Sequence, residues 1–297
     1  NKEKYISKVL YSLKSQVGSF KKEFIFVNDG STDNSLAILK KITKNWNNTK
    51  IISQKNKGPS IATQNGIDSS SGNYLKLVGG DDILTPNCTL ILLNVIKKTK
   101  SIAVFSKYKL LKNLNESKTL KEAPLNIRKI NTPLQSTIKS SFSGTSPNLY
   151  CNYTVKKSGG CNTKLFIEDF SLVLGIARYG SFSFIDNITA FGPKDDKNRI
   201  MLSKKTQLLH DYNAALYYFL KKNNQVDRKI RFIACKKAIG RCEKWARREQ
   251  KKNIINKMNF LKLQFFFGRS DFTEMIKKSC EYFYKNSDKS SIRYKIS

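Results

Sequence analysis

The sequence lacks the features that would mark a membrane-spanning, disulfide-rich or zinc-binding protein. No apolar run approaches the roughly 18 residues of a membrane-spanning helix. The six cysteines form no C-x-x-C pair and no metal-binding spacing, so we expect reduced thiols in a cytoplasmic protein. The single histidine, His210, stands in no metal-binding motif, and we interpret it as a surface or packing residue.

Acidic residues are also scarce. The chain has 22 Asp and Glu against 55 Lys and Arg, a formal net charge of +33, and residues 221–297 alone hold 22 basic and 7 acidic residues. Nucleic acid, an anionic membrane surface and a polyanionic substrate would each fit such a field. A background composition rich in Lys and Asn is the alternative explanation. The charge therefore suggests an anionic partner without selecting one.

What the sequence does contain is an alternation of short apolar runs with amphipathic segments. The apolar runs predict strands at 24–27, 51–52, 74–78, 102–105 and 182–185, and the segments between and before them predict helices at 3–17, 34–44, about 60–70, 87–98 and 168–178. This order predicts an α/β fold with a mostly parallel sheet flanked by helices. The polar, irregular segment 109–140 predicts a substrate-facing loop.

The residues beyond about 200 follow a different pattern. In "RKIRFIACKKAIGRCEKWARREQKK" apolar residues recur at helical spacing, with basic residues on the opposite face. This pattern predicts a helical C-terminal subdomain with a basic surface. We therefore divide the chain into an α/β domain at 1–195 and the C-terminal subdomain at 196–297.

Carboxylates follow two of the predicted strands. Asp29 comes after strand 24–27, and Asp81 and Asp82 come after strand 74–78. Ligands of open α/β sheets gather at the carboxyl ends of the strands, and carboxylates can bind a hard cation such as Mg²⁺ or Mn²⁺. A plain turn at Asp29 and a helix cap at Asp81 and Asp82 are the structural alternatives.

Four segments in a fixed order resemble the family 2 inverting glycosyltransferases of GT-A fold, of the type that builds bacterial surface glycans. They are "VNDGSTD" (27–33), "NKGPSIATQNGI" (56–67), "GNYLKLVGGDDIL" (72–84) and "SGGCNTKLFIEDF" (158–170). The resemblance spans residues 1 to about 192. It also likens Asn1 to the end of the family's first-strand motif, which implies that this first strand would lie upstream of Asn1.

The resemblance implies a nucleotide-binding role for residues of the first two segments. Asp29 corresponds to the residue that accepts a hydrogen bond from N3–H of the base, usually uracil, and an ionised carboxylate is suited to this because it only accepts. Asn56, Gly58 and Asn65 correspond to the loop and helix beside the nucleotide. Gln64 stands where the family commonly has Arg.

The third segment is implied to bind the metal ion. By resemblance Asp81 binds Mg²⁺ or Mn²⁺ together with the nucleotide, and Asp82 is its neighbouring metal ligand. The chemistry requires such a cation, because the donor leaves as a diphosphate and negative charge builds up. Gly79 stands where the family commonly has an Asp that contacts the ribose.

The fourth segment supplies the candidate base. An inverting transfer needs a carboxylate that deprotonates the acceptor hydroxyl as it attacks the anomeric carbon. Glu168 and Asp169 lie directly before an apolar helix, and the resemblance points to Asp169 as the base, with Glu168 second. Simple helix capping is the alternative interpretation.

The sequence thus predicts a metal-dependent inverting glycosyltransferase that moves a sugar from a UDP-sugar to a hydroxyl of a glycan or lipid-linked acceptor. A catalytically inactive nucleotide-binding protein and a basic nucleic-acid-binding protein are the alternatives. Nucleic acid is not the expected partner, because acidic pairs at the ligand edge would repel its phosphates. We expect the basic C-terminal helices to hold the protein at the anionic inner face of the membrane.

Overall fold

The computed structural model of the chain describes residues 1–115, 124–142, 146–194, 205–266, 271–286 and 296. In chain order, the first part contains α1 (Glu3–Lys14), β1 (Phe24–Asp29), α2 (Ser35–Thr43), β2 (Thr49–Gln54), α3 (Pro59–Ser69), β3 (Tyr74–Leu75), β4 (Ile83–Leu84), α4 (Cys88–Thr99), β5 (Ala103–Leu111), β6 (Ile127–Ile130), α5 (Pro133–Ser140), β7 (Asn148–Cys151), α6 (Asn152–Ser158), α7 (Glu168–Ile176) and β8 (Phe182–Pro193). The second part contains α9 (Lys205–Lys222), α10 (Arg228–Arg248), α11 (Lys252–Phe266) and α12 (Phe272–Lys285).

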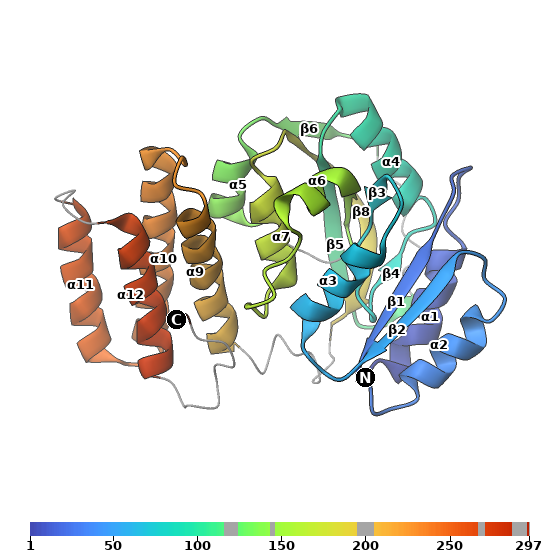
Figure 1. Cartoon of the computed structure of the whole chain (residues 1–297), viewed down its shortest axis with the longest axis horizontal. Helices are drawn as coiled ribbons and strands as arrows, with labels where there is room; N and C mark the ends of the chain where they lie inside the picture. Colours follow the sequence, from blue (N-terminus) through green and yellow to red (C-terminus); the bar gives the residue numbers. More distant parts are fainter. Residues whose placement is uncertain (116–123, 143–145, 195–204, 267–270, 287–295, 297) are drawn as a thin grey trace.

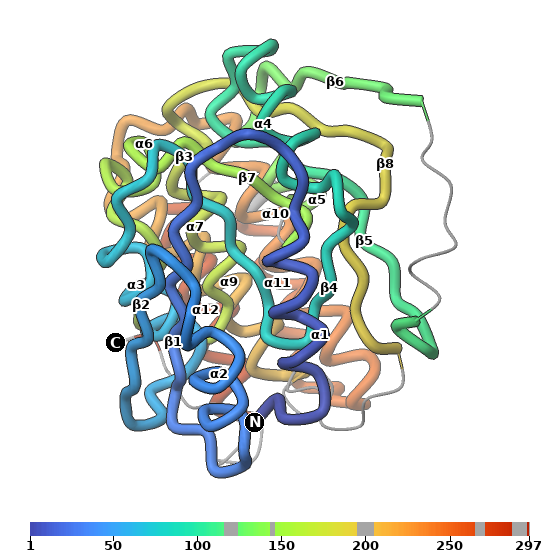
Figure 2. The backbone as a smooth tube through the Cα atoms, turned by 90° about the vertical axis from the view of Figure 1, so that its right-hand side faces the viewer, coloured from blue at the N-terminus to red at the C-terminus, as the bar shows by residue number. Residues whose placement is uncertain are grey.

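The described strands form two sheets. β1 and β2 pair in parallel as one sheet, and the other six strands follow the order β3-β7-β5-β8-β4, with β6 also paired to β8. The β1–β2 sheet lies with α1 and α2 at the end of the molecule opposite to α9–α12 (Figure 1 and Figure 2). Parallel pairing brings the carboxyl ends of β1 and β2 together, and this places Asp29 opposite Gln54.

The predicted α/β class is confirmed, but the pairing is mixed rather than mostly parallel. Among the described strands only β1–β2 and β5–β8 pair in parallel, while β3–β7, β4–β8, β5–β7 and β6–β8 are antiparallel. The alternation of strands and helices suggested crossover units throughout. β6 and β7 depart from this pattern, because each pairs antiparallel with its neighbours in the sheet. Antiparallel pairing does not require the crossover helix that parallel pairing requires.

The prediction of an irregular loop at 109–140 is wrong for most of its described residues. β5 continues to Leu111, β6 covers 127–130 and α5 covers 133–140. β6 is short and has two basic residues between its apolar ends, so its alternation is too weak to be recognised; its partner is β8. Residues 116–123 of this segment lie outside the described residues.

Helices cover both faces of the six-stranded sheet. Because side chains alternate along β5, Ala103 and Phe105 pack with residues of α3, α6 and α7, while Val104 packs with residues of α4. A further core joins α9–α12 to α5 and α7 and includes Phe170 and Leu174. Figure 1 shows α9 next to α7. The C-terminal helices therefore pack against the helix that begins at Glu168. The predicted boundary at 195/196 falls in 195–204, outside the described residues.

Candidate active site

The first cluster of the site surrounds Asp29 at the end of β1. Its Oδ1 accepts hydrogen bonds from Gln54 Nε2 and the Lys57 backbone N–H, both at 2.8 Å, and its Oδ2 accepts the Gly58 N–H at 2.9 Å. Asn65 Nδ2 donates to Gln54 Oε1 at 2.5 Å. The structure thus joins Asp29, Gly58 and Asn65 in one network, which reaches the start of α3.

A close backbone approach shapes the same cluster. Gly30 has φ +67°, and a Cβ at this position would lie 2.7 Å from the backbone nitrogen of Asn56. Only glycine fits both conditions. The Asn56 side chain is exposed, so the loop that follows β2 lies against the turn that follows β1 through its backbone.

The second cluster surrounds Asp81, which follows β3. Lys2 Nζ lies 2.6 Å from Asp81 Oδ2, and the Asp81 side chain is only 15% exposed. The Lys2 backbone N–H donates to Ser35 Oγ at 2.6 Å, and the Thr32 N–H donates to Asn1 Oδ1 at 2.7 Å. Residues 1–2 therefore connect Asp81 to the turn after β1. The sequence motifs did not indicate this role of Lys2.

Asp82 is buried, and both of its carboxylate oxygens are hydrogen-bonded. Oδ1 accepts from Tyr108 Oη at 2.7 Å, and Oδ2 accepts from Ser146 Oγ at 2.5 Å. A Cβ on Gly79 would lie 2.8 Å from Asp82 Oδ2. A side chain at position 79 would therefore force the Asp82 carboxylate to shift. These contacts give Asp82 a role in holding the turn.

The metal-binding prediction rests on Asp81. Within the ranges that the structure describes, no three His, Cys, Asp or Glu side chains converge on a position for a metal ion. Asp81 is partly accessible and is paired with the Lys2 ammonium, which a bound metal ion would have to displace from the carboxylate. A single carboxylate fits a cation of the Mg²⁺ type, which is commonly held by one or two carboxylates and substrate phosphates.

The third cluster contains the predicted base. Glu168 and Asp169 are partly buried in the first turn of α7. Burial raises the pKa of Glu168 to about 8, and the adjacent Asp169 charge adds to this rise. Burial also raises the pKa of Asp169, while the Phe170 N–H, which donates to Asp169 Oδ1 at 2.7 Å, favours its ionised form. Two backbone N–H groups, its own and that of Phe170, thus favour the ionised form of Asp169, against one for Glu168.

Helix α3 holds the loop before this pair. Gln64 Oε1 accepts the Cys161 N–H at 2.8 Å, and Ser60 Oγ donates to the Leu165 carbonyl at 2.5 Å. Gly160 has φ +71°, and a Cβ there would collide with the Gln64 amide. Gln64, a departure from the family pattern, therefore binds the turn of the fourth motif. Neither this contact nor the role of Ser60 was predicted from the sequence motifs.

His210 lies outside these clusters. It is buried in α9, at 1% exposure, and its Nδ1 lies 2.7 Å from Asp211 Oδ1. His210 is therefore a packing residue inside the core and not a surface residue.

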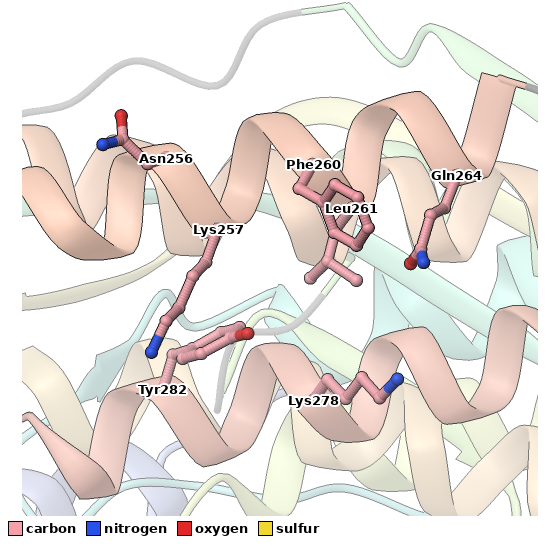
Figure 3. A pocket seen from close by; sticks show the side chains of 7 residues that line it. All are labelled: Asn256, Lys257, Phe260, Leu261, Gln264, Lys278 and Tyr282. Atoms are coloured by element: carbon pink, nitrogen blue, oxygen red, sulfur yellow. The ribbon is translucent and has the colours of Figure 1, made fainter.

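The C-terminal helices carry a groove of their own. It lies between α11 and α12, where Phe260, Leu261 and Tyr282 provide an apolar surface, and Lys257 and Lys278 lie beside it (Figure 3). Phe260 is 60% exposed and Leu263 on the same helix is 58% exposed. No helix in the described part of the chain combines the length and the apolar character needed to cross a bilayer.

The strand-end carboxylates and the carboxylate pair at the start of α7 all lie in the segments that resemble family 2 glycosyltransferases. The sequence model of the family described as Glycosyl transferase family 2 matches residues 1–152, about half of the chain. The chain therefore belongs to this family of glycosyltransferases, and the predicted family is confirmed.

Solved structures confirm the predicted GT-A fold. The chain is similar to S. aureus TarS residues 1–349, with a TM-score of 0.62 and 18% identity over 97% of this chain and 89% of that chain. It is also similar to the complex of the same protein with UDP, with a TM-score of 0.58 and 20% identity over 80% of this chain and 67% of that chain. At these identities the likeness concerns the fold alone.

Curated relatives match over shorter stretches. The uncharacterized glycosyltransferase YibD of Escherichia coli is 41% identical over 64 residues, which cover 22% of this chain and 19% of YibD. The cholesterol galactosyltransferase of Borreliella burgdorferi is 36% identical over 87 residues, which cover 29% of this chain and 24% of that protein. The matched stretches thus span about a fifth to a quarter of these relatives.

Proposed function

We propose that the protein is a metal-dependent inverting glycosyltransferase that uses a UDP-sugar as donor. The observation that carries this proposal is the position of α3. Its first turn binds the Asp29 carboxylate through the Gly58 N–H and the loop of the predicted base through Ser60. The start of α3 thus contacts both Asp29, which is predicted to bind the nucleotide, and the loop that leads into the predicted base. This supports a site in which donor and acceptor are held close together.

Asp29 is assigned to the base of the nucleotide. It accepts three hydrogen bonds in the structure, whereas a carboxylate has about four acceptor positions. One position remains for the N–H of a base such as uracil. Two of the similar TarS structures are complexes with UDP and with UDP-GlcNAc, and this supports a uridine nucleotide. Asn56 and Asn65 are assigned to the loop and helix beside it.

Asp81 is assigned to the metal ion, together with diphosphate oxygens of the donor. A bound Mg²⁺ or Mn²⁺ would supply positive charge for the leaving diphosphate. Asp82 stays the predicted second ligand, although it is buried and its oxygens already accept hydrogen bonds from Tyr108 and Ser146. Lys2 balances the charge of Asp81 in the structure. Its ammonium is a second candidate for contact with the diphosphate.

Asp169 is assigned as the general base and Glu168 as its partner. The ionised Asp169 takes the proton from the acceptor hydroxyl, whose oxygen bonds to the anomeric carbon on the side opposite to the departing diphosphate. The configuration of that carbon is inverted. The raised pKa of Asp169 makes it a stronger base than an ordinary aspartate. Glu168, with a pKa of about 8, stays largely protonated near neutral pH. It therefore places no second negative charge beside the ionised Asp169.

The acceptor is proposed to be a glycan or lipid-linked hydroxyl at the cytoplasmic face of a bacterial membrane, in the synthesis of a surface polysaccharide. The groove between α11 and α12 supports this location. Its exposed Phe260 suits the interfacial region of a bilayer, and Lys257 and Lys278 suit anionic headgroups (Figure 3). Relatives named as a cholesterol galactosyltransferase and a chondroitin synthase are compatible with lipid and glycan acceptors.

A donor panel tests the proposal. Purified chain is mixed with UDP-GlcNAc, UDP-glucose or UDP-galactose and Mn²⁺, and UDP release is followed with and without EDTA. We expect release from at least one donor by transfer of its sugar to water, and loss of release with EDTA. The hydrolysed sugar, observed by NMR before it mutarotates, should have the inverted anomeric configuration. A retained configuration, or equal release with EDTA, would contradict the mechanism.

A further inference from the structure

The loop that precedes the predicted base is also held from the other side, by α9. Asp211 in this helix is fully buried, and its Oδ2 accepts the backbone N–H of Phe166 at 2.5 Å. Phe166 lies two residues before Glu168. None of the four sequence motifs includes Asp211. A carboxylate from the C-terminal helices thus bonds the backbone of the loop that leads into the carboxylate pair.

Asp211 is itself fixed by neighbours of its own helix. Its Oδ1 accepts a hydrogen bond from Gln207 Nε2 at 2.7 Å and lies 2.7 Å from His210 Nδ1. Gln207 is 0% exposed and His210 is 1% exposed. A buried carboxylate with several donors has one low-energy orientation. The acceptor that meets Phe166 is therefore preorganised.

The residues before and after the Glu168–Asp169 pair also pack against the C-terminal helices. Leu165 and Ile167, next to Phe166, are buried in the core formed with the C-terminal helices. After the pair, the ring of Phe170 packs edge-on against that of Tyr212 from α9, with the ring centroids 4.8 Å apart. The backbone around Glu168 and Asp169 is thus clamped between α3 and α9.

We propose that Asp211 is a positioning residue for the Glu168–Asp169 pair. By fixing the Phe166 N–H it sets where α7 begins and hence where the two carboxylates lie. The proposal rests on the proposed function for the reaction that the pair performs. If Asp211 has this role, the C-terminal helices stabilise the fold and also raise turnover, through the hydrogen bond from the Phe166 N–H to Asp211.

The test compares three variants of the full chain with wild type. Asp211→Ala removes the acceptor, and Asp211→Asn keeps the shape and one oxygen in case the alanine variant does not fold. Asn213→Ala is the matched control, because Asn213 is equally buried in α9 but bonds the Ala238 carbonyl and Ser279 Oγ within the C-terminal helices. Asp169→Asn serves as the reference for a lost base.

Two readouts are used. Hydrogen exchange of the Phe166 amide is measured relative to amides inside α7, and kcat and KM are measured for whichever UDP-sugar of the panel turns over. For Asp211→Ala we expect fast exchange at Phe166 and a kcat lowered about 10-fold or more at unchanged KM for the donor. Asp211→Asn should lie between this and wild type. Asn213→Ala should change neither quantity at temperatures where it is folded.

The outcomes separate the two proposals. If Phe166 stays protected in both Asp211 variants, or if their kcat falls no further than that of Asn213→Ala, the positioning role is refuted. If Asp169→Asn retains wild-type turnover, or no donor turns over, the proposed function fails. The exchange of Phe166 then still decides whether Asp211 fixes the loop.

Discussion

Replacing Glu168 by Gln should make the protein more stable at neutral pH. Burial and the Asp169 charge raise the pKa of Glu168 from 4.5 to about 8. The folded protein therefore holds a proton that the unfolded chain releases at lower pH. The contribution to stability is fully present below pH 4.5 and is lost progressively as the pH rises towards 8.

The magnitude follows from the width of this window. Each pH unit inside it lowers the free energy of unfolding by about 1.4 kcal/mol, so wild type should lose about 2 to 3 kcal/mol between pH 5 and pH 7 that Glu168→Gln does not lose. Glutamine has nearly the same shape and no charge. The variant should therefore gain that amount relative to wild type over the same interval.

Urea unfolding of both proteins at pH 5, 6, 7 and 8 measures the difference. Glu249→Gln, at an exposed position after α10, is the control and should track wild type at every pH. A stability difference between Glu168→Gln and wild type that does not change with pH would refute the reasoning.

Three further predictions concern other parts of the molecule. Asp81→Ala should stay folded but lose Mn²⁺-dependent UDP binding in calorimetry, and unchanged affinity would remove Asp81 from the metal site. Gly79→Ala should cost about 1–3 kcal/mol in urea unfolding, because its Cβ would meet Asp82 at 2.8 Å. Gly240→Ala, with nothing within 4 Å of its Cβ, should be neutral or stabilising, and equal costs would refute the clash. Phe260→Ser should weaken binding to vesicles containing anionic phosphatidylglycerol, more so at high salt, where the contribution of the lysines is screened. Tyr153 is an exposed aromatic residue of α6, and Tyr153→Ser should leave vesicle binding unchanged. If both variants lose vesicle binding equally, the α11–α12 groove is not the membrane-binding surface.

The sequence was informative where local pattern and chemistry agree. The helices and strands predicted up to 105 and again between 168 and 185 have counterparts in the structure, because their apolar periodicity matches their burial. The turns after β1 and β3, with Asp29, Gly30 and Asp81, were recognisable because their motifs occur together with two others in a fixed order. Family membership and the GT-A fold followed from these motifs.

The remainder depends on contacts between distant segments. β6 was missed because its alternation is weak and its partner, β8, lies far along the chain. The role of Asp82 could not be foreseen, since its partners Tyr108 and Ser146 come from other parts of the chain. Likewise, Asp211 looked like one polar residue of a helix until α9 was placed against the loop that contains Phe166.

Turnover of Asp169→Asn tests the central claim most directly. With the best UDP-sugar of the panel and Mn²⁺, kcat should fall by about 100-fold or more, the usual scale for a lost general base, while UDP affinity in calorimetry stays at the wild-type value. Asp186→Asn is the matched control and should retain wild-type kcat, because Asp186 is a half-exposed carboxylate that pairs with Lys107 and Asn126, away from the three clusters. Near-normal turnover of Asp169→Asn would contradict its assignment as the base of an inverting transfer.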